Sequence, residues 1–304
     1  MHPWPVFTDA TDALQHRPKK MRIHLFFISL LSLYSAYINR QITICDLKTQ
    51  HPIPFTTIRS IDFKVGGYTD SSGRFELTDE FSDSLVISSI GYVDRKISQK
   101  QLSGDTIYLE PFTTELSTVT VRHSKHVGEM TIGITKGNRS EIWGSSGFGD
   151  EFAQKIYLPD TGKVYKIKTV AIGMERFDET IPMLLHIYHC GTDKLPGKDI
   201  LSSKVLLRRD GFDKRKKKMV IDIASQNIFL HESACFVGVE WLPVQARGRR
   251  LPTSALLLTD DIETELTYSR AFYYNKDKWS NTLRTPGQAS PNNTLISIQV
   301  DVLD

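Results

Sequence analysis

The stretch Thr49–Glu110 decides the fold class of this chain. It contains Gly67-Tyr-Thr-Asp-Ser-Ser-Gly-Arg-Phe-Glu-Leu77, Asp83-Ser-Leu-Val-Ile-Ser-Ser-Ile-Gly-Tyr92 and Asp105-Thr-Ile-Tyr-Leu-Glu110. Short apolar and β-branched runs alternate with turn signals, and the stretch shows no clean helical period. We therefore predict a small all-β sandwich of about seven strands for this region.

Two prolines and one glycine turn set the limits of these strands. Pro52 and Pro54 hold their own φ and push the preceding residues out of the helical region, which predicts a strand over Phe55–Ile58. In Asp70-Ser-Ser-Gly73, Gly73 can take a positive φ, and Asp70 can accept a hydrogen bond from the backbone two residues on. The expected core of the sandwich is Phe55, Ile58, Phe75, Leu77, Leu85, Ile87 and Ile107.

Four motifs of this region, in order and spacing, resemble the carboxypeptidase-like regulatory domain. They are Pro52-Ile-Pro-Phe55, Tyr68-Thr-Asp-x-x-Gly-Arg-Phe75, Leu85-Val-Ile-Ser-Ser-Ile-Gly-Tyr92 and Ile107-Tyr-Leu-Glu-Pro111. The resemblance implies a transthyretin-like β-sandwich at residues 41–121, of the kind found at the N-termini of many secreted or outer-membrane proteins of Gram-negative bacteria. It implies a non-catalytic accessory module and transfers no catalytic residue. The usual Gly-x-Val opening is absent, because the chain reads Gln41-Ile-Thr-Ile-Cys-Asp46.

Composition excludes several classes of protein. A chain of 304 residues has room for about two domains, and a mean hydropathy of −0.26 with 40% hydrophobic residues is typical of a globular protein. The net charge of +3 is too small to indicate a nucleic-acid partner. Cys45, Cys190 and Cys235 allow at most one internal disulfide, and the sequence leaves open whether Cys190 and Cys235 pair.

The N-terminus has the pattern of an export signal. Basic residues between Arg17 and Arg22 precede the apolar run Ile23–Leu33, which is shorter than the ~20 residues that span a membrane. We expect residues 1–40 to be a signal peptide and extension, with either Met1 or Met21 as the start. The alternative is an uncleaved anchoring helix. The predicted location is the periplasm, outer membrane or cell surface of a Gram-negative bacterium.

The second half is predicted to be a larger, jelly-roll-like β-sandwich at residues 153–304, joined to the first by a glycine-containing linker at 122–152. Its expected strands are Lys155–Leu158, Val164–Ile172, Met183–Tyr188, Lys204–Leu207, Met219–Ile223, Cys235–Leu242, Ala255–Thr259, Ala271–Tyr274 and Leu295–Val300.

Neither metal binding nor nucleophilic catalysis is indicated. On a strand, His186 and His189 would point to opposite faces, and His231 with Cys235 lies in a strand-like context, so we predict no metal site. Gly144-Ser-Ser-Gly147 and Ser88-Ser-Ile-Gly91 lack the strand-to-helix elbow of a serine nucleophile. We predict that the protein is not an enzyme and needs no cofactor.

Two surface features could bind a ligand. The basic runs Lys214–Lys218 and Arg247–Arg250 could contact anionic lipid or polymer, although a solvated loop is the simpler interpretation. Among the late aromatic residues, Tyr273 and Trp279 are the candidate ligand-binding residues, although packing in a core is the favoured interpretation of these aromatics.

These observations predict a non-catalytic accessory or scaffold protein of the cell envelope that binds a protein partner. The alternative is a carbohydrate-binding module protein of a glycan-using bacterium. Membrane association could come from an uncleaved signal segment or from a basic loop.

Overall fold

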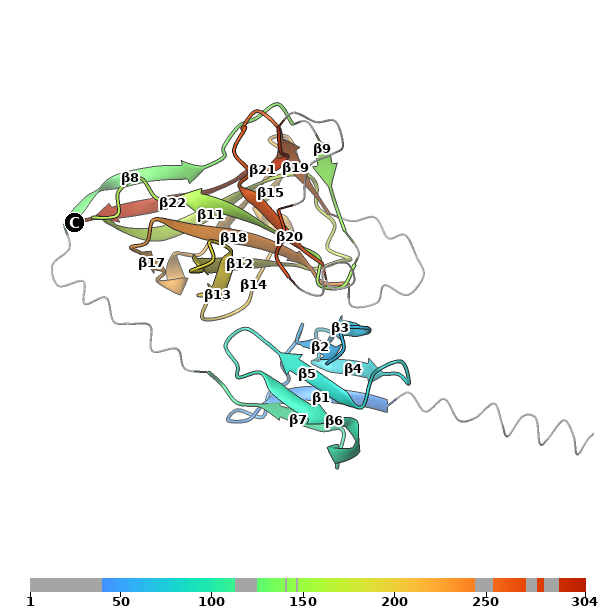
Figure 1. The fold of residues 1–304 in the computed structure, drawn as a ribbon. Coiled ribbons are helices and arrows are strands. Elements are labelled where there is room, and N and C mark those ends of the chain that lie inside the picture. Colours follow the sequence, from blue (N-terminus) through green and yellow to red (C-terminus); the bar gives the residue numbers. More distant parts are fainter. Residues whose placement is uncertain are drawn as a thin grey trace, which may run out of the picture. The chain divides into compact units, whose positions relative to one another are not determined.

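The computed structural model describes residues 40–112, 125–139, 141–145, 147–243, 254–271, 278–281 and 290–304. Over these residues the protein is all-β, with three single-turn 3-10 helices as its helical elements. Its strands form two bodies, the first body at 40–112 and the second body at 125–304 (Figure 1). Residues 40–304 belong to one compact unit.

The first body is a seven-stranded sandwich, as predicted. One sheet has the order β4-β1-β7 and the other the order β3-β2-β5-β6. The elements are β1 (Arg40–Asp46), β2 (Thr57–Ser60), β3 (Gly66–Tyr68), β4 (Arg74–Leu77), β5 (Ser84–Ser88), β6 (Arg95–Ser98), η1 (Gln99–Gln101) and β7 (Thr106–Leu109).

The turn and core predictions hold for most of the named residues. Gly73 has φ +71°, and the Asp70 carboxylate accepts hydrogen bonds from the backbone N–H groups of Ser72 and Arg74. Five predicted core residues are buried, and Phe75 is half-buried against them; the five are Ile58, Leu77, Leu85, Ile87 and Ile107.

Phe55 is the exception, and the strand expected to begin there begins at Thr57. Phe55 adopts a φ of +51°, and its N–H donates to the carbonyl of Thr69. Because of this turn, the Phe55 ring lies outside the core of the first body and packs in a separate apolar cluster with Tyr68 and Phe148. The prediction failed because an extended residue after Pro54 was assumed where the chain bends.

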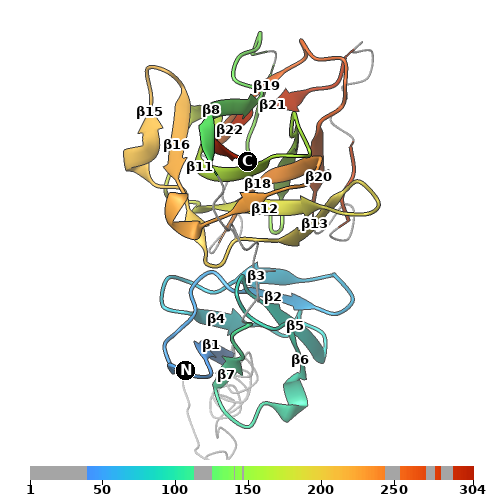
Figure 2. The same cartoon turned by 90° about the vertical axis from the view of Figure 1, so that its left-hand side faces the viewer.

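The second body is a sandwich of two larger sheets. One has the order β13-β12-β18-β10-β20, with β14 beside β12. The other has the order β15-β16-β11-β19-β21, and β17, β22, β8 and β9 join it. Figure 2 shows β15 and β16 at the outer edge of this larger sheet, next to β11.

The elements of the second body are β8 (His126–Gly133), β9 (Glu141–Trp143), β10 (Glu151–Tyr157), β11 (Val164–Arg176), β12 (Met183–Cys190), β13 (Pro196–Asp199), β14 (Val205–Leu206), η2 (Arg209–Gly211), β15 (Phe212–Asp213), β16 (Lys218–Asp222), η3 (Ala224–Gln226), β17 (Phe229–Leu230), β18 (Ala234–Trp241), β19 (Ala255–Thr259), β20 (Thr267–Arg270), β21 (Asn293–Thr294) and β22 (Ile296–Leu303). Eight strands of the second body overlap the predicted ones, namely β10, β11, β12, β14, β16, β18, β19 and β22, whereas β8, β9, β13, β15, β17, β20 and β21 were not predicted.

The expected linker at 122–152 is not a plain connection. It contains β8, which pairs with β22, and β9, which pairs with β19, so the second body begins near residue 126. Glycine content suggested a loop, but long-range pairing with the C-terminal strand makes β8 part of the sheet. Residues 272–274 of the expected strand Ala271–Tyr274 lie outside the described residues. Residues 113–121, at the expected end of the first domain, also lie outside them.

Candidate functional site

A buried charged network occupies the face of β12 and β18 that points away from the main core of the second body. His186 on β12 contacts Asp199 through Nδ1 at 2.7 Å and Glu240 on β18 through Nε2 at 3.0 Å. The residue opposite His186 in the strand pairing is Gly238. A Cβ added there would lie 2.2 Å from Oε1 of Glu151, so the glycine leaves room for the network.

A second ion pair adjoins the first. Arg270 donates from Nε to Glu151 at 2.8 Å, and its Nη2 lies 2.7 Å from the same carboxylate oxygen. The hydroxyl of Tyr188 donates to the other oxygen of Glu151 at 2.8 Å. Tyr188 also stacks on His186, with ring centroids 5.4 Å apart. The two ion pairs therefore form one continuous polar layer.

The network favours the charged forms of His186 and Glu240 despite their burial, whereas burial raises the pKa of Glu151. Burial alone disfavours the imidazolium of His186, but the carboxylates of Glu151, Asp199 and Glu240 outweigh it and raise the pKa of His186 to about 10. The Glu240 carboxyl is also buried, yet its hydrogen bond to His186 and the nearby positive charges hold its pKa below the ordinary value. His186 is thus a fixed cation at neutral pH.

Two contacts tie this layer to the first body. The hydroxyl of Tyr68, the last residue of β3, donates to Oε1 of Glu240 at 2.6 Å and accepts from the N–H of Gly149 at 3.0 Å. The ammonium group of Lys204 donates to the carbonyl oxygens of Pro54 and Phe55, the latter at 2.9 Å. Burial lowers the pKa of Lys204 to about 7, with the Glu240 charge acting in the opposite direction.

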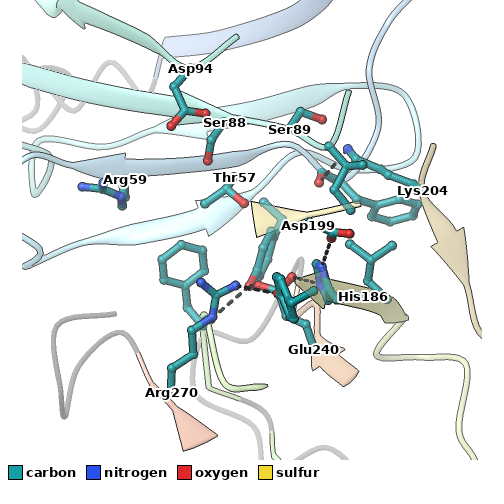
Figure 3. A pocket seen from close by; sticks show the side chains of 17 residues that line it. Thr57, Arg59, Ser88, Ser89, Asp94, His186, Asp199, Lys204, Glu240 and Arg270 are labelled. Carbon is teal, nitrogen blue, oxygen red and sulfur yellow. Dashed lines mark hydrogen bonds and ion pairs between the residues drawn. The ribbon is translucent and has the colours of Figure 1, made fainter. Parts of the chain in front are cut away.

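A cavity of about 350 Å³ lies between the network and the first body. We call it the seam cavity. One wall is the network wall, which includes His186, Asp199, Glu240 and Arg270; the other is the hydroxyl wall of the first body, formed by Thr57, Arg59, Ser88, Ser89 and Asp94 (Figure 3). Its volume lies within the range of small-ligand pockets.

The hydroxyl wall follows from strand geometry. Side chains alternate along a strand, so Thr57 and Arg59 share one face of β2 while Ile58 points to the core. Thr57 pairs with Ser88 on β5, which puts their side chains on the same face. Ser89 follows directly, and its buried hydroxyl has no hydrogen-bond partner among the described residues.

Of the two candidate ligand-binding residues predicted from the sequence, Trp279 is among the described residues. Trp279 packs edge-on against Tyr188 with centroids 5.8 Å apart, and the Arg270 guanidinium lies 4.9 Å from the centre of its ring. Trp279 thus supports the network at its edge and does not line the seam cavity. Tyr273 lies outside the described residues.

The two strand histidines point to opposite faces, as predicted. His189 pairs with Glu232, away from His186. Cys235 is fully buried in the main core of the second body, whereas Cys190 packs in a different cluster with Tyr188 and Phe236. All three cysteines are free thiols in this structure.

The basic run Lys214–Lys218 forms the hairpin between β15 and β16. Lys217 is bound to Glu175 through two contacts of 2.7 Å, and Lys216 lies 3.7 Å from Asp213. These partners support the interpretation of a solvated hairpin. The second run, Arg247–Arg250, lies outside the described residues.

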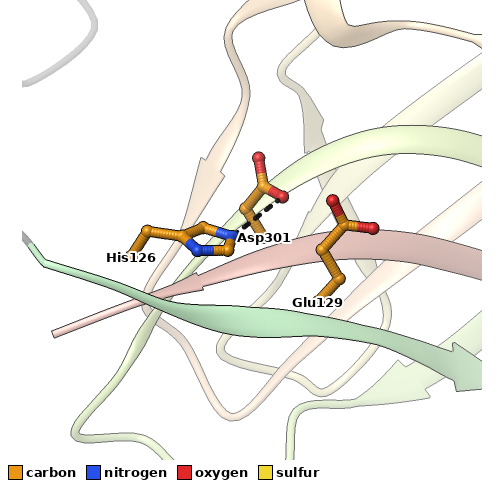
Figure 4. Close-up of side chains that lie close together, drawn as sticks. All are labelled: His126, Glu129 and Asp301. Atoms are coloured by element: carbon orange, nitrogen blue, oxygen red, sulfur yellow. Dashed lines mark ion pairs between the residues drawn. The ribbon is translucent and has the colours of Figure 1, made fainter.

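One group of side chains has the residue types of a metal site. His126 and Glu129 on β8 and Asp301 on β22 place ligand atoms within 4.8 Å of one another (Figure 4). The ammonium of Lys168 lies 2.8 Å from Glu129 and 3.4 Å from Asp301. Because this cation already pairs with both carboxylates at the surface, we interpret the cluster as an ion-pair network.

Sequence reasoning missed the seam cavity. The sequence places Ser88 and Ser89 outside a catalytic elbow and offers His186 only as a metal ligand, so neither segment indicates a shared cavity. The sequence signals that could have revealed the cavity are polar residues within apolar strands, such as Glu240 in the otherwise apolar β18. Such residues mark a buried polar layer, but a single strand does not identify the partner strand.

Comparison with known proteins gives little further information. No family model matches the sequence, and no curated protein matches it significantly. Among solved structures, the chain is similar to the cysteine protease and lectin-like domains of Cwp84, a surface layer associated protein of Clostridium difficile, with 9% identity and a TM-score of 0.37. The match covers 82% of this chain and 59% of that one, so the chain spans less than two thirds of that structure. A TM-score of this size does not establish a shared fold. Within the described residues, no helix is long and apolar enough to cross a membrane.

Proposed function

We propose that this chain is a non-catalytic binding protein of the cell envelope, and that the seam cavity is its ligand site. The observation that carries the proposal is the contrast between the two walls. On the network wall, every charged group named above already has a partner within the protein. On the hydroxyl wall, the side chains of Thr57, Ser88, Ser89 and Asp94 make no hydrogen bond within the described part of the chain.

The network supports a binding role over a catalytic one. A general base must be unprotonated, which for a histidine is the neutral form, and it must reach the proton that it removes. Both ring nitrogens of His186 are occupied by carboxylates, and its pKa of about 10 keeps it protonated at neutral pH. Its described partners do not include a serine hydroxyl of the opposite wall.

The N-terminal pattern supports export to the envelope, and the resemblance of the first body to the carboxypeptidase-like regulatory domain supports an accessory role. We extend the proposal accordingly: the first body is a member of that family, and it contributes one wall of the site. N-terminal sequencing of protein from the envelope fraction tests the location. Recovery of an intact Met1 or Met21 terminus from the cytosol would contradict it.

Ligand-observed NMR on the full-length protein tests the binding role. The probes are monosaccharides, amino acids, dicarboxylic acids and nucleosides. We expect at least one class to bind, to remain chemically unchanged, and to lose binding when Ser89→Phe fills the cavity. The matched control is Ser71→Phe, at an exposed turn position in the same body. Failure of every class to bind, binding that survives in Ser89→Phe, or turnover of a probe would overturn the proposal.

A scaffold that binds a protein partner is the second candidate. Four large apolar side chains on β8 and β9 are exposed: Val127, Met130, Ile142 and Trp143. A subset of these side chains that shares one face of the sheet could contribute to a docking surface. If this candidate is correct, Trp143→Asp will abolish co-purification of one defined envelope protein, whereas Ser89→Phe will not.

A further inference from the structure

The charges and hydrogen-bonding groups of the seam cavity narrow the chemistry of its ligand. We infer that the cavity binds a neutral sugar ring, held through its hydroxyl groups by the hydroxyl wall. This inference rests on the proposed binding function and specifies its ligand class.

The first argument is the mixture of donors and acceptors. The hydroxyls of Thr57, Ser88 and Ser89 each donate and accept, and Asp94 accepts only. Arg59 donates only, and its guanidinium is held 4.2 Å from the centre of the Phe63 ring. A sugar ring presents neighbouring hydroxyls that also donate and accept, so a single ring can satisfy all of these groups.

The second argument is charge balance. The cationic lining residues Arg59, His186 and Arg270, together with Lys204, whose pKa is lowered to about 7, face the carboxylates of Asp94, Asp199 and Glu240, with Glu151 bound behind Arg270. A phosphate or carboxylate ligand would have acceptors only, and it would meet the carboxylate of Asp94, which lines the same cavity. A cationic ligand would meet the guanidinium of Arg59. A neutral ligand avoids both the repulsion between an anion and Asp94 and the repulsion between a cation and Arg59.

The third argument is the unpartnered hydroxyl of Ser89. A buried hydroxyl without a partner is unfavourable, and a change of rotamer that turns the Ser89 Oγ toward a ligand hydroxyl would give it a hydrogen bond. The apolar neighbours Phe55 and Ile90 line the same cavity and offer surfaces against which the C–H groups of a sugar ring can pack. The polar and apolar parts of the site therefore match the two faces of a sugar.

Isothermal titration calorimetry on the full-length protein tests the ligand class. The probes are glucose, galactose, mannose and N-acetylglucosamine, with glucuronate, inorganic phosphate and putrescine as the charged comparison set. We expect saturable binding of at least one neutral sugar. Asp94→Asn should raise its Kd at least about tenfold, because a charge-assisted acceptor becomes a neutral amide. Arg59→Gln should act in the same direction.

The control is Asp83→Asn, an exposed acid of the same body whose partner is Lys100 at 2.9 Å. Thermal melting confirms that each variant is folded. If glucuronate, phosphate or putrescine binds and the neutral sugars do not, the ligand class is wrong and the proposed function stands. If none of the probes binds, or if sugar binding is unchanged in both Asp94→Asn and Ser89→Phe, the ligand class is wrong and the seam cavity loses its support as the site.

Discussion

Removal of the His186 cation should destabilise the protein strongly. His186→Leu leaves the carboxylates of Asp199 and Glu240 facing each other in a buried layer. The side chains of Asp199 and Glu240 are 17% and 10% exposed, so water cannot replace the lost partner effectively. Breaking a buried ion pair by removing one partner costs about 3–5 kcal/mol, and we expect a loss of this size in the free energy of unfolding.

His189→Leu is the matched control. It lies on the same strand, is the same residue type and also contacts a carboxylate, that of Glu232, but its side chain is 41% exposed. Exposed ion pairs contribute about 0–1 kcal/mol, so this variant should lose less than about 1 kcal/mol. Urea unfolding followed by tryptophan fluorescence measures both variants, and unchanged m-values show that the unfolding transition is comparable.

The pH dependence gives a separate check on the same reasoning. The pKa of His186 is about 10 in the folded protein and 6.5 in its ordinary state, so the folded state binds more protons between these values. The stabilisation by His186 is complete below the ordinary pKa and is lost as pH rises through about 10. Lys204, with its lowered pKa of about 7, acts in the opposite direction in the same range, and its contribution cancels when wild type and His186→Leu are compared. The difference between the two should shrink as pH rises from neutral to about 10. Equal losses for His186→Leu and His189→Leu, or a difference that grows with pH, would refute the argument.

Three further predictions follow from burial. Ile87→Ala should lower the free energy of unfolding by about 2–5 kcal/mol because Ile87 is fully buried. Val93→Ala, at a side chain that is 45% exposed, should lower it by less than about 0.5 kcal/mol, and urea unfolding measures both variants. Tyr68→Phe should lower the free energy of unfolding by about 1.5–3 kcal/mol, because it removes the hydrogen bond to the Glu240 carboxylate. Limited proteolysis should then show faster cleavage between the two bodies, and cleavage at the wild-type rate would contradict this. Burial raises the pKa of the Cys45 thiol and raises that of Cys235 to about 12. A thiol reagent near pH 8 should therefore modify half-buried Cys190 first. Peptide mapping that finds Cys235 modified first in the folded protein would contradict the assigned burial.

The sequence by itself determined the fold class and much of the local structure. Short apolar and β-branched runs placed strands such as β5 and β18, and Asp70 with Gly73 specified the turn between β3 and β4, because these features depend on backbone preferences within a short segment. Phe55 shows the limit of such reasoning, since Pro54 restricts its neighbours without determining where the ring packs.

Only the tertiary structure decided the site. His186, Glu240 and Tyr68 lie on three strands that are far apart in the sequence, and they meet because β12 pairs with β18 and because the first body packs beside them. The sequence does not show what lies opposite Ser88 and Ser89, whereas the structure shows that the second body forms the opposite wall of the cavity. A strand pattern specifies which face of a strand is polar, but strand pairing over long sequence separations decides which polar faces come together.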